Sequence, residues 1–179
     1  RTIESFYKWS GGGRIPIFCD TTSCTHTLLF ETGGDILTPE NREKYKQLKI
    51  MDITQWLKEV VLPRIKVIRP KNRILLHPTC SCQIMGLTPV LLDIARKCAR
   101  EVILPDNWGC CGASGDRGFI FPELSDSATR DERDEIGHES FDGCYSLART
   151  CEIAMQDHIE QPYESIVYLV DETIQDQGT

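Results

Sequence analysis

Residues 73–80 read Arg-Ile-Leu-Leu-His-Pro-Thr-Cys, a short apolar run that Pro78 brings to an end. Such a run, bounded by turn-forming residues, is typical of a buried strand. Residues 102–104, Val-Ile-Leu, form a second run of this kind. Between the two runs, residues 90–99 place their apolar side chains at helical spacing. The stretch therefore predicts a strand, a helix and a second strand, the unit from which parallel sheets are built.

The same alternation of strands and helices continues outward in both directions along the chain. It predicts an α/β fold, with one open parallel sheet of about four to five strands and helices on both faces, in a Rossmann-like arrangement. Further strands are expected at residues 14–18 and 48–51, and either a strand or a loop at 138–143. Helices are expected at residues 23–29, 38–47, 52–65, 123–136, 146–159 and 163–174.

Length and composition describe an ordinary globular chain. Its 179 residues are 40% hydrophobic and 26% charged, about one domain's worth of sequence. No window approaches the ~18 uninterrupted apolar residues that a membrane helix needs. The formal net charge of −7 disfavours nucleic acid as a partner, because binding to phosphates depends mainly on positive charge.

The beginning of the chain suggests a piece of a longer polypeptide. The numbering opens on Arg1, and the first residues lack the apolar segment of a secretory signal. We expect residues 1–13 to be a leader or linker from an upstream domain, residues 14–175 to form the domain, and residues 176–179 to be a tail. We also expect a cytoplasmic protein that meets the inner membrane only through partners.

Nine cysteines are the outstanding feature of the composition. Their odd number, the chain length and the absence of a secretion signal disfavour a disulfide framework. Most of them follow expected strands, at the sheet edge where ligands bind in open α/β folds. Cys98 differs, because it lies on an apolar helix face and fits the hydrophobic core. Two roles are open for Cys19, Cys82 and Cys144: they support the metal ligands from behind, or they are simply buried in the core.

Thiolates select iron–sulfur clusters, zinc or Cu(I), whereas magnesium and calcium prefer oxygen ligands. Five thiols from four separate loops exceed the four ligands that a cubane cluster takes, so an iron–sulfur cluster is the leading hypothesis. Zinc is an alternative, although the chain has no C-x-x-C pair. Thiol–disulfide chemistry at the adjacent Cys110 and Cys111 is a third hypothesis. The candidate ligands are Cys24, Cys80, Cys110, Cys111 and Cys151.

Other polar residues near these cysteines have several interpretations. Backbone amides at Gly112 and Gly115, together with the positive charge of Arg117, are expected to tune a cluster through hydrogen bonds and charge. His77 fits a ligand, a proton donor or a hydrogen-bonded histidine at the end of a strand. The acidic residues 131–135 fit a solvated helix face.

Three segments of the sequence carry a family resemblance: His77-Pro78-Thr79-Cys80, Cys110-Cys111-Gly112 and Thr150-Cys151-Glu152. They resemble the cysteine-rich CCG domain found in heterodisulfide reductases and in the iron–sulfur subunit of glycolate oxidase. A closer resemblance, to the C-terminal iron–sulfur region of bacterial FAD-linked D-lactate dehydrogenases, is carried by Ser23-Cys24-Thr25, residues 110–119, Pro122-Glu123-Leu124 and Arg149-Thr150-Cys151-Glu152. This resemblance spans residues 15–173. The family motif closes with C-x-x-C, whereas six residues separate Cys144 from Cys151 here.

The resemblance implies a function and a set of ligands. It implies a 4Fe-4S type of cluster that relays electrons from a flavin to an acceptor protein or a quinone-linked chain. Cys80, Cys110 and Cys111 would hold the cluster, Cys151 would close the ligand set, and Cys24 would add a thiol. The FAD would lie on an upstream domain, where a 2-hydroxy acid is oxidised, so this fragment is not expected to be catalytic alone. A zinc-stabilised domain that docks a flavoprotein, or a thiol–disulfide redox domain, is the alternative.

Overall fold

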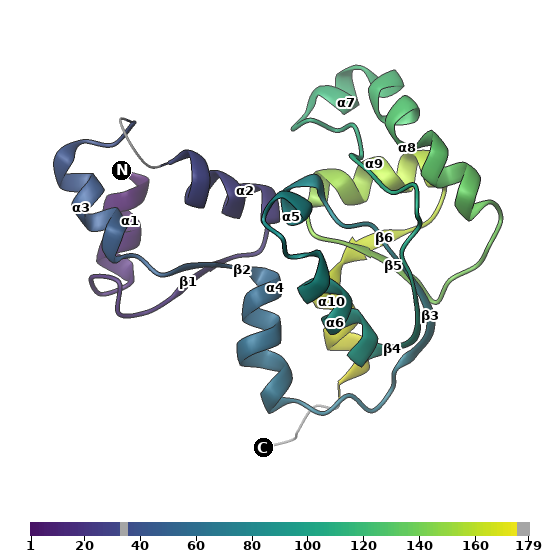
Figure 1. Cartoon of the computed structure of the whole chain (residues 1–179), viewed down its shortest axis with the longest axis horizontal. Helices are drawn as coiled ribbons and strands as arrows, with labels where there is room; N and C mark the ends of the chain where they lie inside the picture. Colours follow the sequence, from purple (N-terminus) through teal and green to yellow (C-terminus); the bar gives the residue numbers. More distant parts are fainter. Residues whose placement is uncertain (33–35, 175–179) are drawn as a thin grey trace.

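The computed structural model describes residues 1–32 and 36–174, and a four-stranded parallel sheet lies at its centre (Figure 1). The strand order is β4-β3-β5-β6, and each neighbouring pair is parallel. The chain runs from β3 to β4 on one side and later returns to place β5 on the other side of β3. This reversal creates a crevice at the carboxyl ends of β3 and β5, where ligands bind in such folds. The strands are β3 (Lys71–Leu76), β4 (Ala99–Ile103), β5 (Gly143–Ser146) and β6 (Tyr163–Ser165).

Helices cover both faces of this sheet, which confirms the α/β, Rossmann-like fold. Side chains alternate along β3, so Ile74 and Leu76 join one core cluster and Leu75 joins the other. α6 and α10 pack on the first face, while α8 and α9 pack on the second. Their bounds are α6 (Thr88–Cys98), α10 (Ile166–Thr173), α8 (Pro122–Ile136) and α9 (Arg149–Ile159).

A smaller lobe at the left of Figure 1 contains a separate two-stranded parallel sheet. Here β1 (Ile17–Cys19) pairs with β2 (Ile50–Asp52) in the region where two short strands were expected. Residues 1–13, expected to be a leader, begin with the helix α1 (Thr2–Trp9), which contacts α3 (Pro39–Gln47). α3 begins as the sequence predicts, because the Thr38 side chain accepts a hydrogen bond from the Asn41 N–H.

Several short helical segments complete the described residues. The segment expected to be one helix from residue 52 to 65 consists of three consecutive helical pieces, and Asp52 caps the first of them through the Thr54 N–H. The tail at residues 176–179 lies outside the described residues. The remaining elements are α2 (Thr22–His26), η1 (Thr27–Glu31), α4 (Ile53–Trp56), η3 (Leu57–Val61), η4 (Leu62–Arg64), α5 (Cys80–Ile84) and α7 (Arg117–Ile120).

Two sequence expectations near the C-terminus were wrong in detail. Residues 163–174 were expected to be helical throughout, but Tyr163–Ser165 form the edge strand β6 before α10 begins. Three residues are too few for an alternating pattern, so this strand is defined by its pairing with β5. A helix was expected from residue 146, but the strand β5 covers Gly143–Ser146 and α9 begins at Arg149, while residues 138–142, expected to be a strand or a loop, form a loop; Cys144 therefore lies inside β5 and not after it.

No helix within residues 1–32 and 36–174 is long and apolar enough to cross a membrane.

Cys98 lies in the hydrophobic core, as the helical spacing of the apolar residues around it predicts. It is fully buried on α6, inside the core cluster that faces α10. We expect Cys98→Ala to lower the free energy of unfolding by about 1–2 kcal/mol, as for other small truncations in a core, and to leave bound metal unchanged. Chemical denaturation and metal analysis of the purified variant test this expectation. Loss of metal in this variant would contradict a purely structural role.

Candidate functional site

Three connections that leave the carboxyl edge of the sheet supply the cysteines of the candidate site. β3 leads through His77 and Pro78 to Cys80, the first residue of α5. β4 leads to the loop that carries Cys110 and Cys111, and β5 leads to α9, which carries Cys151 in its first turn. The parallel strands thus bring together residues that are up to 71 positions apart in the sequence.

One pair of these four thiols is in direct contact, and the other two lie close enough to take part in the electrostatics of the pair. Cys111 Sγ lies 2.9 Å from Cys151 Sγ, and both side chains are buried. The Cys110 thiol interacts with the thiols of Cys111 and Cys80. Cys80 and Cys110 are exposed, so the four thiols extend from the surface to the interior. Cys80, Cys110, Cys111 and Cys151 therefore form one group, which we call the thiol group.

A glycine holds the Cys-Cys-Gly loop in place beneath α8. Gly112 has a φ of +73°, and a Cβ atom there would lie 2.6 Å from the backbone oxygen of Leu124. Only glycine allows this close approach with such a backbone conformation. From this position the Gly112 N–H donates a hydrogen bond to Cys110 Sγ at 3.4 Å. The loop thus directs a backbone amide at a sulfur of the thiol group.

The surroundings of Cys110 and Cys111 raise the pKa of each thiol and so favour its protonated form. The hydrogen bond with Cys110 lowers the pKa of Cys111, but the hydrogen bond with Cys151 and burial outweigh it and raise that pKa to about 12. The hydrogen bond with Cys111 and burial also raise the pKa of Cys110. A metal binds thiolates, so loading this group must release protons.

Thiolates are the ligands that a soft metal prefers, but the present spacing of these sulfurs is that of hydrogen-bonded thiols. Two thiolates on one tetrahedral metal, each about 2.3 Å from it, stand about 3.8 Å apart, and the cysteine sulfurs of a cubane cluster, each on its own iron, stand farther apart still. The 2.9 Å between Cys111 Sγ and Cys151 Sγ is shorter, so these sulfurs must separate when a metal binds. In the part of the chain that the structure describes, no three His, Cys, Asp or Glu side chains form a group that could hold a metal ion.

The other predicted site residues lie on α2 and in the loop and short helix that follow Gly112, and Cys24 is not brought into the thiol group. Cys24 is exposed on α2, a helix that contacts α5, and its nearest thiol interaction is with Cys19. Burial, followed by the effect of Cys19, raises the pKa of Cys24. Gly115 has a φ of +77° in the loop after Gly112, and Arg117 begins α7 with an exposed side chain.

Cys82 and Cys144, whose roles the sequence left open, both lie in the hydrophobic core. Cys82 belongs to the core cluster on the α6 face, and Cys144 to the cluster on the α9 face. Burial raises the pKa of each thiol to about 12. Both are therefore protonated core residues in this structure.

Sequence reasoning missed a buried pair of polar side chains next to the Cys80 connection. His77 and Glu132 are both almost completely buried, and His77 Nδ1 lies 2.9 Å from Glu132 Oε2. The expectation that residues 131–135 form a solvated face was therefore wrong for Glu132. A signal was present, because Ser125, Thr129, Glu132 and Ile136 recur at helical spacing and are all buried on α8. His77 Nε2 has no hydrogen-bond partner among the described residues.

The His77–Glu132 pair is expected to stabilise the fold. Glu132→Ala removes the acceptor of a buried ring nitrogen, so we expect it to lower the free energy of unfolding by about 1–3 kcal/mol. Glu132→Gln keeps an acceptor oxygen and should cost less. Asp131→Ala, at the exposed neighbouring position, is the matched control. Chemical denaturation measures all three variants, and equal losses for the two alanine variants would contradict the assignment.

The raised thiol pKa values also predict how metal-free protein responds to alkaline pH. The buried thiols of Cys82, Cys111 and Cys144 have folded-state pKa values of about 12, above the ordinary value of 9.0. Their stabilising contribution is present below pH 9 and is lost as the pH rises from 9 toward 12, because the unfolded chain ionises first. Denaturation at pH 8 to 11 under reducing conditions should show this loss. In Cys144→Ala, the unfolding free energy should fall less steeply with pH. An unchanged dependence on pH would contradict a contribution from the Cys144 thiol.

Comparison with known proteins finds no family model that matches the chain and no match among curated protein sequences.

Proposed function

We propose that this chain is an electron-transfer domain that holds an iron–sulfur cluster on Cys80, Cys110, Cys111 and Cys151. The observation that carries the proposal is the convergence of four thiols from three separate connections at the crevice of a parallel sheet. Such a thiol-rich donor set suits iron–sulfur clusters, whose irons are held by cysteine thiolates. When bound, the cluster would accept and release electrons.

The residues of the chain have distinct tasks in this proposal. Cys111 and Cys151 would hold the cluster from the buried side, and Cys80 and Cys110 from the exposed side. The Gly112 N–H would donate to the Cys110 sulfur, which favours the thiolate and shifts the reduction potential upward. The exposed thiols mark the side from which electrons would arrive or leave.

The resemblance to the CCG domain supports the same function and suggests the partners. On this basis the electrons come from a flavin centre on an upstream domain that oxidises a 2-hydroxy acid. They leave to an acceptor protein or a quinone-linked chain. A reducing compartment such as the cytoplasm would keep the nine cysteines available as thiols.

One contact favours a second candidate function, a thiol–disulfide couple between Cys111 and Cys151. Their sulfurs are 2.9 Å apart, and a disulfide needs about 2.05 Å. Exchange with a small disulfide would join the two sulfurs and release two small thiols, with both electrons passing to the small disulfide. The raised pKa of Cys111 opposes this reaction, because the attacking species is the thiolate.

A redox titration of anaerobically purified protein separates the candidates. The cluster predicts visible absorption that bleaches with dithionite and returns with ferricyanide, without loss of titratable thiols. The disulfide couple predicts no visible colour and the reversible loss of two thiols in metal-free protein. A zinc-stabilised docking domain predicts neither signal, so a colourless and redox-silent protein would overturn the proposal.

A further inference from the structure

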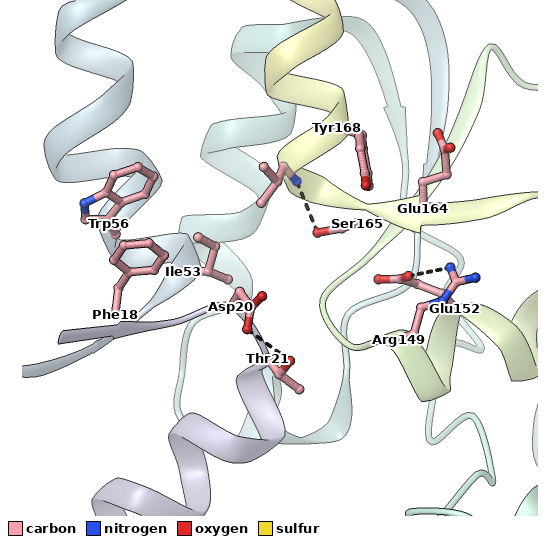
Figure 2. A pocket seen from close by; sticks show the side chains of 11 residues that line it. Phe18, Asp20, Thr21, Ile53, Trp56, Arg149, Glu152, Glu164, Ser165 and Tyr168 are labelled. Carbon is pink, nitrogen blue, oxygen red and sulfur yellow. Dashed lines mark hydrogen bonds and ion pairs between the residues drawn. The ribbon is translucent and has the colours of Figure 1, made fainter. Parts of the chain in front are cut away.

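A cavity of about 630 Å³ lies between the smaller lobe and the carboxyl ends of β5 and β6 (Figure 2). This volume is within the range of about 300–1,000 Å³ that small-molecule sites usually have. Arg149 and Glu152 line the cavity from the first turn of α9, the same turn that presents Cys151 to the thiol group. None of the cysteines of the thiol group lines it. The cavity is therefore a second site that the electron-transfer function does not use.

Aromatic rings form two sides of this cavity. Phe18 from β1 stacks on Trp56 from α4, with 4.6 Å between ring centroids and 15° between ring planes. Tyr168 from α10 stands on another side of the cavity, as Figure 2 shows. Phe18 is 46% exposed and Tyr168 is 56% exposed, so apolar ring surface remains open to a ligand. The faces of such rings carry partial negative charge and attract cations.

The charged side chains of the cavity are mostly acidic. Asp20, Glu152 and Glu164 contribute three carboxylates, and Arg149 contributes the single guanidinium, which gives a formal charge of −2. Arg149 already pairs with Glu152, with 3.1 Å between nitrogen and oxygen. No ion pair joins Asp20 or Glu164 to a basic side chain among the described residues. The carboxylates of Asp20 and Glu164 therefore keep uncompensated charge at the cavity, although Asp20 Oδ1 accepts a hydrogen bond from Thr21 Oγ1 at 3.5 Å.

Helix dipoles oppose this negative charge without reversing it. Thr21, Arg149 and Ser165 place the amino-terminal ends of α2, α9 and α10 at the cavity wall. Each end carries roughly +0.5 charge, so the three together offset at most about 1.5 charges. The amino-terminal end of α4 is already capped by the Asp52 carboxylate. The lining thus keeps a net negative charge, which favours a cationic ligand over an anionic one.

We propose that this cavity binds a small organic cation, an ammonium ion with an aromatic or alkyl body. The body would lie against the open faces of Phe18 and Tyr168, and the positive charge would face Asp20 and Glu164. Aromatic surface combined with carboxylates is the arrangement by which proteins recognise alkylated ammonium groups. This binding does not depend on metal at the thiol group. The binding proposal can therefore be tested independently of the electron-transfer proposal.

Three probes that share one ring and differ in charge test the proposal on the full chain by isothermal titration calorimetry. They are benzyltrimethylammonium, benzyl alcohol and benzoate. We expect the cation to bind about tenfold more tightly than the neutral alcohol, the factor that roughly 1.4 kcal/mol of cation–π and charge attraction gives. Metal-free and metal-loaded protein should bind the cation equally. Benzoate should bind most weakly.

Variants locate the binding within the cavity. Glu164→Gln and Phe18→Leu should each weaken binding of the cation several-fold, whereas Glu40→Gln, at an exposed carboxylate on α3, should leave it unchanged. Circular dichroism checks that each variant is folded. The proposal is overturned if benzyltrimethylammonium does not bind, if benzoate binds more tightly, or if Glu164→Gln and Glu40→Gln behave alike.

Discussion

Cys111→Ser should lose the proposed iron–sulfur cluster while keeping most of its helix content. A hydroxyl group is a poor replacement for a thiolate, and Cys111 contacts both Cys110 and Cys151 within the thiol group. We expect an at least about tenfold loss of bound iron, because removing even an outer-shell partner of a metal typically costs 10–100-fold in affinity. Iron analysis and visible absorption measure the loss, and Cys98→Ala is the matched control.

The fold of the Cys111→Ser variant should survive, because the sheet has its own core. Ile74, Leu75 and Leu76 are completely buried on β3 and belong to two clusters that cover both faces. A chain of this size buries about 70% of the surface that the unfolded chain exposes, so it need not rely on metal for folding. Circular dichroism decides the question. A coil-like spectrum for the metal-free protein would show that metal supplies the folding free energy, as it does in small metal-dependent domains.

Gly112→Ala should have the second large effect. Its φ of +73° is strained for any residue with a Cβ, and the added atom would lie 2.6 Å and 2.7 Å from backbone atoms of Leu124 and Ser125. Strain of this kind costs about 1–3 kcal/mol, and overpacking against a rigid backbone costs a similar amount. We therefore expect a loss of about 2–6 kcal/mol in unfolding free energy. The loop should also lift away from α8, which would weaken metal binding.

Gly115→Ala separates these two causes. Gly115 has a similar φ of +77°, but nothing lies within 4 Å of the position of its Cβ. This variant should show the cost of backbone strain alone and keep its metal. Chemical denaturation and iron analysis of both variants provide the comparison. Equal losses in the two would mean that the contact with α8 does not hold the loop.

Much of the central fold could be predicted from local sequence signals. The run at Ile74-Leu75-Leu76 is apolar because both faces of β3 are covered, and the spacing of Leu91, Ile94, Ala95 and Cys98 matches the buried face of α6. Short elements at the sheet edge were harder to predict from the sequence. β6, for example, has three residues and is defined by its pairing with β5. No pattern within the sequence reveals a partner strand at such short length.

The candidate site was predictable in part, through topology. Parallel strands carry the residues after β3, β4 and β5 to one edge of the sheet, and this placed Cys80, Cys110, Cys111 and Cys151 together. The pairing of His77 with Glu132 was missed, because it depends on how α8 rotates against the sheet. That rotation follows from packing, such as the close approach of Gly112 to Ser125, and not from the order of charges along the helix.

Iron and acid-labile sulfide analysis of anaerobically purified protein tests the central claim most directly. The proposed electron-transfer domain predicts iron and sulfide in equal amounts, about four of each per chain, as expected for a 4Fe-4S type of cluster. These amounts should fall together in Cys111→Ser and remain unchanged in Cys98→Ala. Stoichiometric zinc without sulfide, or a protein that stays metal-free after anaerobic reconstitution with iron and sulfide, would contradict the claim.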